Sequence, residues 1–352
     1  MRISEIVGHS DAIRLLDMEL SSQKLSHAYL LWGPRGSGRT LLATRLALSA
    51  NCTSRPGEEF RLGYCGECTN CEKIIRGSHP DFSTISPDGG SIKISQIREM
   101  QSRISLRPNE AELKTWVIRR ADLMTEEAQN CLLKVLEEPP GHALIILTAE
   151  SPAALLPTVA SRCHRVRMTC LPVNVLSAWA IEQLGLTKER ARFLARLSGG
   201  LPGRVVRLAS DAEYFETRDL IISTARKLAG CGDGADALAA SEEILECVKK
   251  ASGKAAEDDA STEAATIASP SGVCNVIAAW FRDLFLLRAT GDEELVMNSD
   301  YLTAMLDDAQ RHESGVFSEW AAHAVRTAEA IRANANVRLA MDDLFLSIAL
   351  VL

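Results

Sequence analysis

The octapeptide GPRGSGRT begins at Gly33 and stands between the apolar run AYLLW and the helical stretch LLATRLALSA. A phosphate-binding loop has the pattern G-x-x-x-x-G-K-[ST] and joins a buried strand to the N-terminus of a helix. The octapeptide supplies Gly33, Gly36, Gly38 and Thr40, and Arg39 stands where the pattern has lysine. The sequence therefore predicts a strand–loop–helix unit with a degenerate phosphate loop.

Strand and helix patterns alternate through the first 170 residues, which is typical of a parallel sheet covered by helices on both faces. The predicted strands are HAYLLW, DFSTIS, TWVIR, ALIILT and HRVRM. From about Pro172 the strand signals stop and helical periodicity continues to the end of the chain. We expect an α/β class chain with a P-loop parallel-sheet domain over 1–170, a small helical lid over 171–211 and an all-helical domain over 212–352.

One segment of the helical part differs in composition. Residues 249–272 are rich in Ala, Ser, Glu and Asp and contain no aromatic residue. This composition predicts a flexible insertion between two helices, and a functional acidic segment is the alternative.

Charge and composition exclude some classes of protein. The net charge of −7 excludes a protein whose whole surface binds DNA, although a local basic patch remains compatible with it. The sequence contains no run of about 18 apolar residues, so we expect no membrane span. The N-terminal sequence has no signal-peptide core. We expect a cytoplasmic chain whose ten cysteines are reduced or metal-bound.

Hydrolysis of ATP needs more than a phosphate loop. A carboxylate at the end of a later strand must hold Mg²⁺, but the strand in KTWVIRR ends at Arg119 and Arg120. Arg39 keeps the charge of the usual lysine in a planar, bulkier group. We therefore expect ATP binding that is weak or absent and no turnover. The alternative is a local bulge that brings Asp122 into the position of the metal-binding acid.

A cysteine cluster follows the first predicted helix. Cys65, Cys68 and Cys71 have C-x₂-C-x₂-C spacing, and Cys52 precedes them. Four thiolates bind Zn²⁺ tetrahedrally and leave no open position, so the pattern predicts a structural zinc module over 52–71. We expect the other cysteines to be small core residues and His79 to lie in a turn rather than in the metal site.

The stretch WVIRRADLMTEEAQNCLLKVLEEPPGHALIILTAESPAALLPTVASRC resembles bacterial clamp-loader subunits of the AAA+ class. The features shared with that family are NCLLKVLEEPP, SRC and the opening IVGHSDAIRLL, and the similarity spans roughly residues 5–210. The resemblance implies an AAA+ domain with a zinc module, a lid, and a helical domain that joins a collar of related subunits. Its ATP-hydrolysing gamma/tau members have Lys where this chain has Arg39, and Asp-Glu at 119–120.

The resemblance also implies a role for the SRC triplet. In this family its arginine reaches into the nucleotide site of the next subunit, which makes Arg162 the candidate arginine finger acting in trans. In family ATPases a lid arginine stands at the position of Gly203 here, and Arg204 is displaced by one residue. The implied partners are gamma/tau and delta subunits in a hetero-oligomer and, indirectly, the sliding clamp and primed DNA.

Two alternative functions stay open from the sequence. The first alternative is an ATP-hydrolysing gamma/tau-type motor subunit, and the second is a zinc-dependent DNA-binding module without a loader role.

Arg98, Arg103 and Arg107 lie on and beyond one predicted helix and are either DNA contacts or solvated side chains. Glu137 and Glu138 end a helix, where we expect capping or interface contacts rather than acid–base catalysis.

Overall fold

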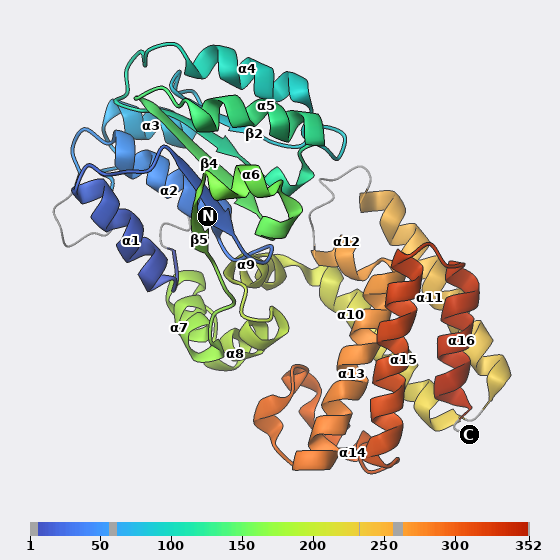
Figure 1. Cartoon of the computed structure of the whole chain (residues 1–352). Coiled ribbons are helices and arrows are strands. Elements are labelled where there is room, and N and C mark those ends of the chain that lie inside the picture. Colours follow the sequence, from blue (N-terminus) through green and yellow to red (C-terminus); the bar gives the residue numbers. More distant parts are fainter. Residues whose placement is uncertain (1–5, 56–61, 232, 256–262, 351–352) are drawn as a thin grey trace. The chain divides into compact units, whose positions relative to one another are not determined.

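The computed structural model describes residues 6–55, 62–231, 233–255 and 263–350. Contacts divide the chain into two compact units (Figure 1). Unit 1 comprises Met1–Trp179 and Leu201–Gly203, and unit 2 comprises Ala180–Gly200 and Arg204–Leu352. The three-domain division expected from the sequence stays a prediction. No helix in the described part of the chain is long and apolar enough to cross a membrane.

Unit 1 alternates strands and helices, as the sequence predicted. Its main elements are α1 (Ser10–Ser21), β1 (Ala28–Trp32), α2 (Arg39–Asn51), α3 (Thr69–Arg76), β2 (Phe82–Ile85), α4 (Ile94–Ile104), β3 (Lys114–Ile118), α5 (Glu126–Glu137), β4 (Ala143–Ala149), α6 (Pro157–Ser161), β5 (His164–Arg167) and α7 (Val173–Leu184), whose end lies in unit 2. Two 3₁₀ turns, η1 (Ala121–Leu123) and η2 (Pro152–Ala154), follow β3 and β4.

The five strands form one parallel sheet in the order β2-β3-β4-β1-β5. All five lie where the sequence predicted strands. Trp32 at the end of β1 pairs with Ala149 of β4 and with Arg167 of β5. The carboxyl ends of these strands therefore meet at one edge, which is where ligands bind in open parallel sheets.

The core of unit 1 lies on both faces of this sheet. In β1, Leu30 faces the cluster that includes buried residues of α4, α5 and α6, while Tyr29 and Leu31 face the cluster that includes those of α1 and α2. The same alternation holds for β4, where Ile145 and Ile146 belong to opposite clusters. Because successive strand residues point to opposite faces, continuous apolar strands indicate burial on both sides.

Unit 2 is helical throughout its described residues. Its elements are α8 (Lys188–Leu197), α9 (Pro202–Ser210, which begins in unit 1), α10 (Ala212–Cys231), α11 (Gly234–Ala255), α12 (Glu263–Ile267), α13 (Pro270–Thr290), η3 (Glu293–Leu295), η4 (Ser299–Tyr301), α14 (Leu302–Asp308), α15 (Ser314–Arg332) and α16 (Val337–Ala349). Aromatic side chains of α13 and α15 pack together in its core, with ring centroids 4.8 Å apart for Phe281 and Trp320.

The segment 249–272 differs from the expected loop. Helix α11 continues through Ala255, α12 begins at Glu263 and α13 begins at Pro270, while 256–262 lie outside the described residues. The Glu263 side chain is 7% exposed and accepts hydrogen bonds from Arg204 and Arg207. The expectation of a loop is thus wrong for the described residues, because tertiary ion pairs favour helix where composition alone suggested solvent exposure. Its flexibility stays a prediction.

Candidate functional site

The phosphate loop lies between β1 and α2 and depends on glycine backbone conformations. Gly36 has φ 91° and Gly38, which precedes α2, has φ 97°, both in the left-handed region. A Cβ atom on Gly33 would lie 1.9 Å from the carbonyl oxygen of Met168. These glycines are therefore required by the loop and its close contact with the segment after β5.

Gly203, in the first turn of α9, lies directly on the phosphate loop. Its N–H donates to the carbonyl oxygen of Gly36 at 2.9 Å, and a Cβ atom at 203 would lie 3.0 Å from that oxygen. The resemblance to clamp-loader subunits implies an arginine at this position in the ATP-hydrolysing members of the family. With glycine there, the backbone at 203 closes against the loop without a side chain between them.

Arg39 begins α2 with its side chain largely buried, at 8% exposure for the residue. Burial lowers the pKa of its guanidinium, and the nearby Glu150 and Asp122 carboxylates offset part of that effect. Its Nη1 and the buried hydroxyl of Ser37 have no hydrogen-bond partner among the described residues. A guanidinium stays protonated in proteins, so the loop holds a positive charge in place of the lysine ammonium. Thr40 follows it in the first turn of α2.

The end of β3 presents arginines where a metal-binding acid would be needed. Strand β3 ends at Ile118, and Arg120 has a left-handed backbone with φ 54°. The Arg120 N–H donates to the Thr148 hydroxyl at 3.1 Å. Asp122 lies in η1, and its Oδ1 is buried without a hydrogen-bond partner among the described residues. Two cations, Arg119 and Arg120, therefore follow the strand directly, and electrostatic repulsion disfavours Mg²⁺ beside them.

The SRC triplet connects α6 to β5, and its three side chains have different environments. Ser161 Oγ donates to the Thr158 carbonyl at 3.1 Å, and Arg162 Nη1 donates to the same oxygen at 3.1 Å. Cys163 is buried in the core of unit 1. The Arg162 side chain is 37% exposed and pairs with Glu137 at 2.9 Å. Ser161 and Arg162 are thus both accessible, and Arg162 is the member of the triplet that carries a charge.

The predicted zinc ligands come together in space. The Sγ atoms of Cys52, Cys65, Cys68 and Cys71 all lie within 4.8 Å of one another. A tetrahedron of zinc-bound sulfurs has edges of about 3.8 Å, so the four residues fit a structural Zn²⁺. Cys52 directly follows the last residue of α2, and Cys68 caps the N-terminus of α3. A bound zinc would join α2 to α3 by short links.

Backbone N–H groups prepare these sulfurs for a metal. The N–H of Cys65 points to the Cys52 sulfur, that of Cys68 to the Cys65 sulfur, and that of Cys71 to the Cys68 sulfur, at 3.3–3.5 Å. Burial raises the pKa of the Cys68 thiol, but hydrogen bonds from Cys71 and Thr53 outweigh it and lower that pKa to about 6. The thiolate is the metal-binding form, so Cys68 is prepared for a metal, whereas burial raises the pKa values of Cys52 and Cys71.

His79 and the dispersed cysteines lie outside this cluster. The His79 ring is buried, accepts from the Asp81 N–H at 3.0 Å and contacts Asn70 at 3.3 Å, in agreement with its exclusion as a ligand. Cys163 and Cys274 are buried, as expected for core residues, whereas Cys131 and Cys247 are only partly buried and Cys170 is exposed. The core expectation is therefore wrong for Cys170, which follows β5 at the surface. The environment of Cys231 lies outside the described residues.

The basic residues on and beyond α4 are exposed. Arg103 pairs with Glu99 at 3.0 Å within the helix, and Arg98 and Arg107 are exposed. The arrangement is compatible with solvated side chains and with phosphate contacts alike.

A Ser–His–Asp arrangement in unit 2 was not singled out from the sequence. His323 on α15 contacts the Ser347 hydroxyl at 2.8 Å and the Asp343 carboxylate at 2.9 Å. The Ser347 hydroxyl donates its proton to the Leu344 carbonyl at 2.7 Å, within helix α16. A nucleophilic serine would instead give its proton to the histidine, so these contacts tie α15 to α16.

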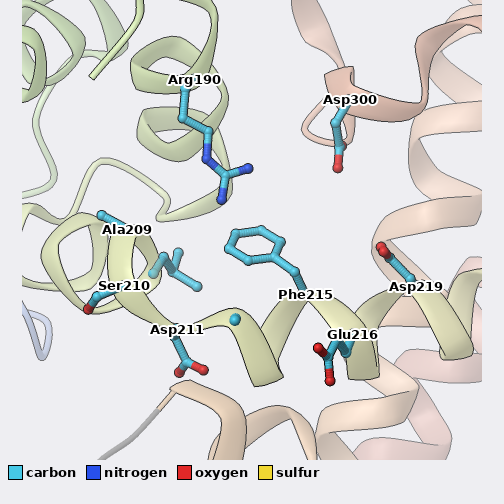
Figure 2. A pocket seen from close by; sticks show the side chains of 10 residues that line it. Arg190, Ala209, Ser210, Asp211, Phe215, Glu216, Asp219 and Asp300 are labelled. Carbon is cyan, nitrogen blue, oxygen red and sulfur yellow. The ribbon is translucent and has the colours of Figure 1, made fainter. Parts of the chain in front are cut away.

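Unit 2 also contains an open pocket of about 520 Å³ that the sequence gave no reason to expect. Figure 2 shows the Arg190 side chain above the Phe215 ring, with Asp219 and Asp300 on the side of Phe215 away from Ala209 and Ser210. The Arg190 guanidinium carbon lies 4.3 Å from the centre of that ring. Asp300 is bound by Arg218, and Asp219 accepts from the Tyr301 hydroxyl at 2.7 Å, so two of its acids are already engaged.

Comparison with known proteins gives consistent matches to one group. Residues 8–172 match the family model described as DNA polymerase III, delta subunit. DNA polymerase III subunit delta' of Bacillus subtilis is 36% identical over 213 residues, covering 60% of this chain and 62% of that protein. The subunit delta' of Pseudomonas aeruginosa is 34% identical, covering 58% and 61%. The matches thus span less than two thirds of the length of these relatives.

A gamma/tau subunit matches a longer part of this chain. DNA polymerase III subunit gamma/tau of Mycobacterium tuberculosis is 30% identical over 250 residues, covering 67% of this chain and 43% of that protein. Among solved structures, a gamma subunit-related protein of Thermotoga maritima aligns with a TM-score of 0.42 at 20% identity, over 96% of this chain and 99% of that one.

Proposed function

We propose that this chain, whose residues 8–172 match the family model described as DNA polymerase III, delta subunit, is the delta-prime subunit of a bacterial clamp loader. In that complex it is a non-hydrolysing AAA+ subunit that supplies Arg162 to the ATP site of a neighbouring gamma/tau-type subunit. It thereby helps to load the sliding clamp onto primed DNA during replication. The delta-prime relatives, at 34–36% identity, support the assignment.

The absence of turnover rests on one observation: two arginines follow β3 where a metal-binding carboxylate is required. Arg119 and Arg120 occupy that place, and the Arg120 backbone is bound to Thr148. Gly203 supports the same conclusion because its backbone lies against the phosphate loop at Gly36. A site with cations at the metal position and a closed loop favours at most weak ATP binding.

The proposed role in trans rests on the exposure and chemistry of Arg162. A planar guanidinium can spread positive charge over the γ-phosphate oxygens, and arginine fingers contribute roughly 10³–10⁵-fold in related reactions. Arg162 follows α6, its side chain is partly exposed, and its neighbour Cys163 is fixed in the core. The guanidinium is thus presented from a rigid element. The zinc module formed by Cys52, Cys65, Cys68 and Cys71 serves stability and takes no part in this reaction.

A gamma/tau-type motor is the second candidate because a gamma/tau relative matches 67% of this chain. It predicts that the isolated chain hydrolyses ATP with Mg²⁺ and loses that activity in Thr40→Ala. Our proposal predicts no such activity in the isolated chain.

The proposal is tested in a complex reconstituted with the gamma/tau-type and delta-type subunits of the same organism. Arg162→Ala is expected to leave the chain folded and the complex assembled, and to lower its ATPase activity by roughly 10²-fold or more. Arg165→Ala, which changes an exposed arginine of β5, is the matched control and keeps the activity. Equal activity of the two variants would remove the finger from the proposal.

A further inference from the structure

The Arg162 guanidinium is held by groups from two helix ends. Its Nη2 lies 2.9 Å from Glu137 Oε1 at the end of α5, and its Nη1 donates to the Thr158 carbonyl at 3.1 Å. A guanidinium has five N–H groups in a fixed plane. The one hydrogen bond to Thr158 and the ion pair to Glu137 restrict that plane, and the other N–H groups have no hydrogen-bond partner among the described residues.

The two helix ends are themselves held rigidly. Gln129 of α5 accepts the Leu156 N–H at 2.7 Å just before α6, and Val159 of α6 is buried against the same core. The Arg162 N–H donates to the Val159 carbonyl at 3.2 Å. The backbone at both helix ends is thus fixed. Forming the ion pair therefore costs only the conformational entropy of the Arg162 and Glu137 side chains.

The residue that directly follows α5 offers no such contact. Glu138 is exposed, and no ion pair to it is present in the described part of the chain. Of the two acids in LEEPP, only Glu137 therefore meets Arg162. Both members of the pair are partly exposed, at 37% for Arg162 and 49% for Glu137, so the pair contributes little to folding stability.

We propose that Glu137 is a positioning residue for Arg162: its carboxylate and the Thr158 carbonyl orient the guanidinium so that its remaining N–H groups are available to the phosphates of a neighbouring subunit. This inference rests on the proposed function, because it needs Arg162 to act in trans. Glu137 touches neither nucleotide nor metal, and it acts only through the arginine. Loss of its carboxylate therefore lowers the rate of hydrolysis without changing how the neighbour binds ATP.

The test compares Glu137→Ala, Glu137→Gln and Glu138→Ala in the reconstituted complex. We expect Glu137→Ala to lower kcat by roughly 3- to 30-fold with the KM for ATP unchanged, since misplacement of a group that acts on the transition state costs up to about 10²-fold. Glu137→Gln keeps an oxygen beside Nη2 and restores most of the rate. Glu138→Ala is the matched control and has the parent rate. Melting temperatures and assembly of all variants verify that folding is unchanged.

A double variant separates the inference from the proposed function. Glu137→Ala added to Arg162→Ala should lower the rate no further than Arg162→Ala alone, because the carboxylate works through the arginine. If Arg162→Ala itself leaves the ATPase unchanged, the proposed function fails. If Arg162→Ala lowers the rate while Glu137→Ala matches Glu138→Ala or raises the rate, the positioning role of Glu137 is wrong and the finger assignment stands.

Discussion

At the scale of single residues, the buried Asp81 carboxylate holds the loop that precedes β3. It lies between α3 and β2, is 1% exposed, and accepts hydrogen bonds from three consecutive backbone N–H groups at 109–111. The Lys114 ammonium lies 3.7 Å away. Burial alone would raise the pKa of this carboxyl, but the N–H groups and Lys114 outweigh it, and the pKa is lowered.

A lowered pKa fixes the direction of the pH dependence. Asp81 stabilises the fold above the carboxyl pKa of the unfolded chain, about 4, and that contribution is lost as the pH falls through the lower folded value. We expect Asp81→Asn to lower the free energy of unfolding at neutral pH by about 2 kcal/mol, because hydrogen bonds to a charged acceptor are weakened.

Urea denaturation at several pH values measures this effect. The difference between Asp81→Asn and the parent chain should shrink below about pH 4. Asp88→Asn changes an exposed acid and serves as the control. A difference that stays constant down to pH 2 would contradict the account of Asp81.

The roles of some residues could be predicted from the sequence, and those of others could not. The three-residue spacing of Cys65, Cys68 and Cys71 has a direct chemical meaning, so the metal cluster could be predicted from the sequence alone. The contact between Arg162 and Glu137 could not, because it joins two helix ends that are distant in sequence and depends on how α5 and α6 pack. The structural role of Asp81 could not be predicted either, because its partners are backbone N–H groups of a later loop.

At the scale of elements, the four cysteines that could hold a metal connect the end of α2 to the start of α3. The small apolar cluster around Leu48, Cys71 and Ile74 is supported mainly by the cysteines themselves. We expect the purified chain to contain a single zinc ion, and Cys68→Ser to lose it and to lower the free energy of unfolding by about 2 kcal/mol or more.

Metal analysis and thermal unfolding test this expectation together. A strong chelator should reproduce the lower melting temperature of Cys68→Ser in the parent chain. Cys170→Ser, at an exposed cysteine away from the cluster, should keep both the zinc and the stability. A chain that contains no zinc, or one whose stability is indifferent to the chelator, would contradict a structural metal here.

Elements whose pattern decides their structure were predicted well, and those decided by tertiary contacts were not. Strands β1 and β4 are nearly continuous apolar runs, which is the signal of strands buried on both faces of a sheet. The described part of 249–272 has no such signal, and it is helical where Glu263 is held by Arg204 and Arg207. Composition cannot reveal that two arginines more than fifty residues earlier neutralise this acid.

At the scale of the whole molecule, unit 1 has a parallel sheet with a phosphate loop after β1, and Arg119 and Arg120 follow β3. The backbone N–H of Gly203 donates to the Gly36 carbonyl in that loop, and the Arg162 side chain is partly exposed. The central claim is that this chain contributes to hydrolysis in a neighbouring subunit and performs none itself.

The most direct test places two variants side by side in the reconstituted clamp-loader complex and measures steady-state ATP hydrolysis. Thr40→Ala changes the loop of this chain, and Arg162→Ala removes the exposed cation. The account predicts parent activity for Thr40→Ala and a loss of roughly 10²-fold or more for Arg162→Ala. A loss of activity in Thr40→Ala with parent activity in Arg162→Ala would contradict it.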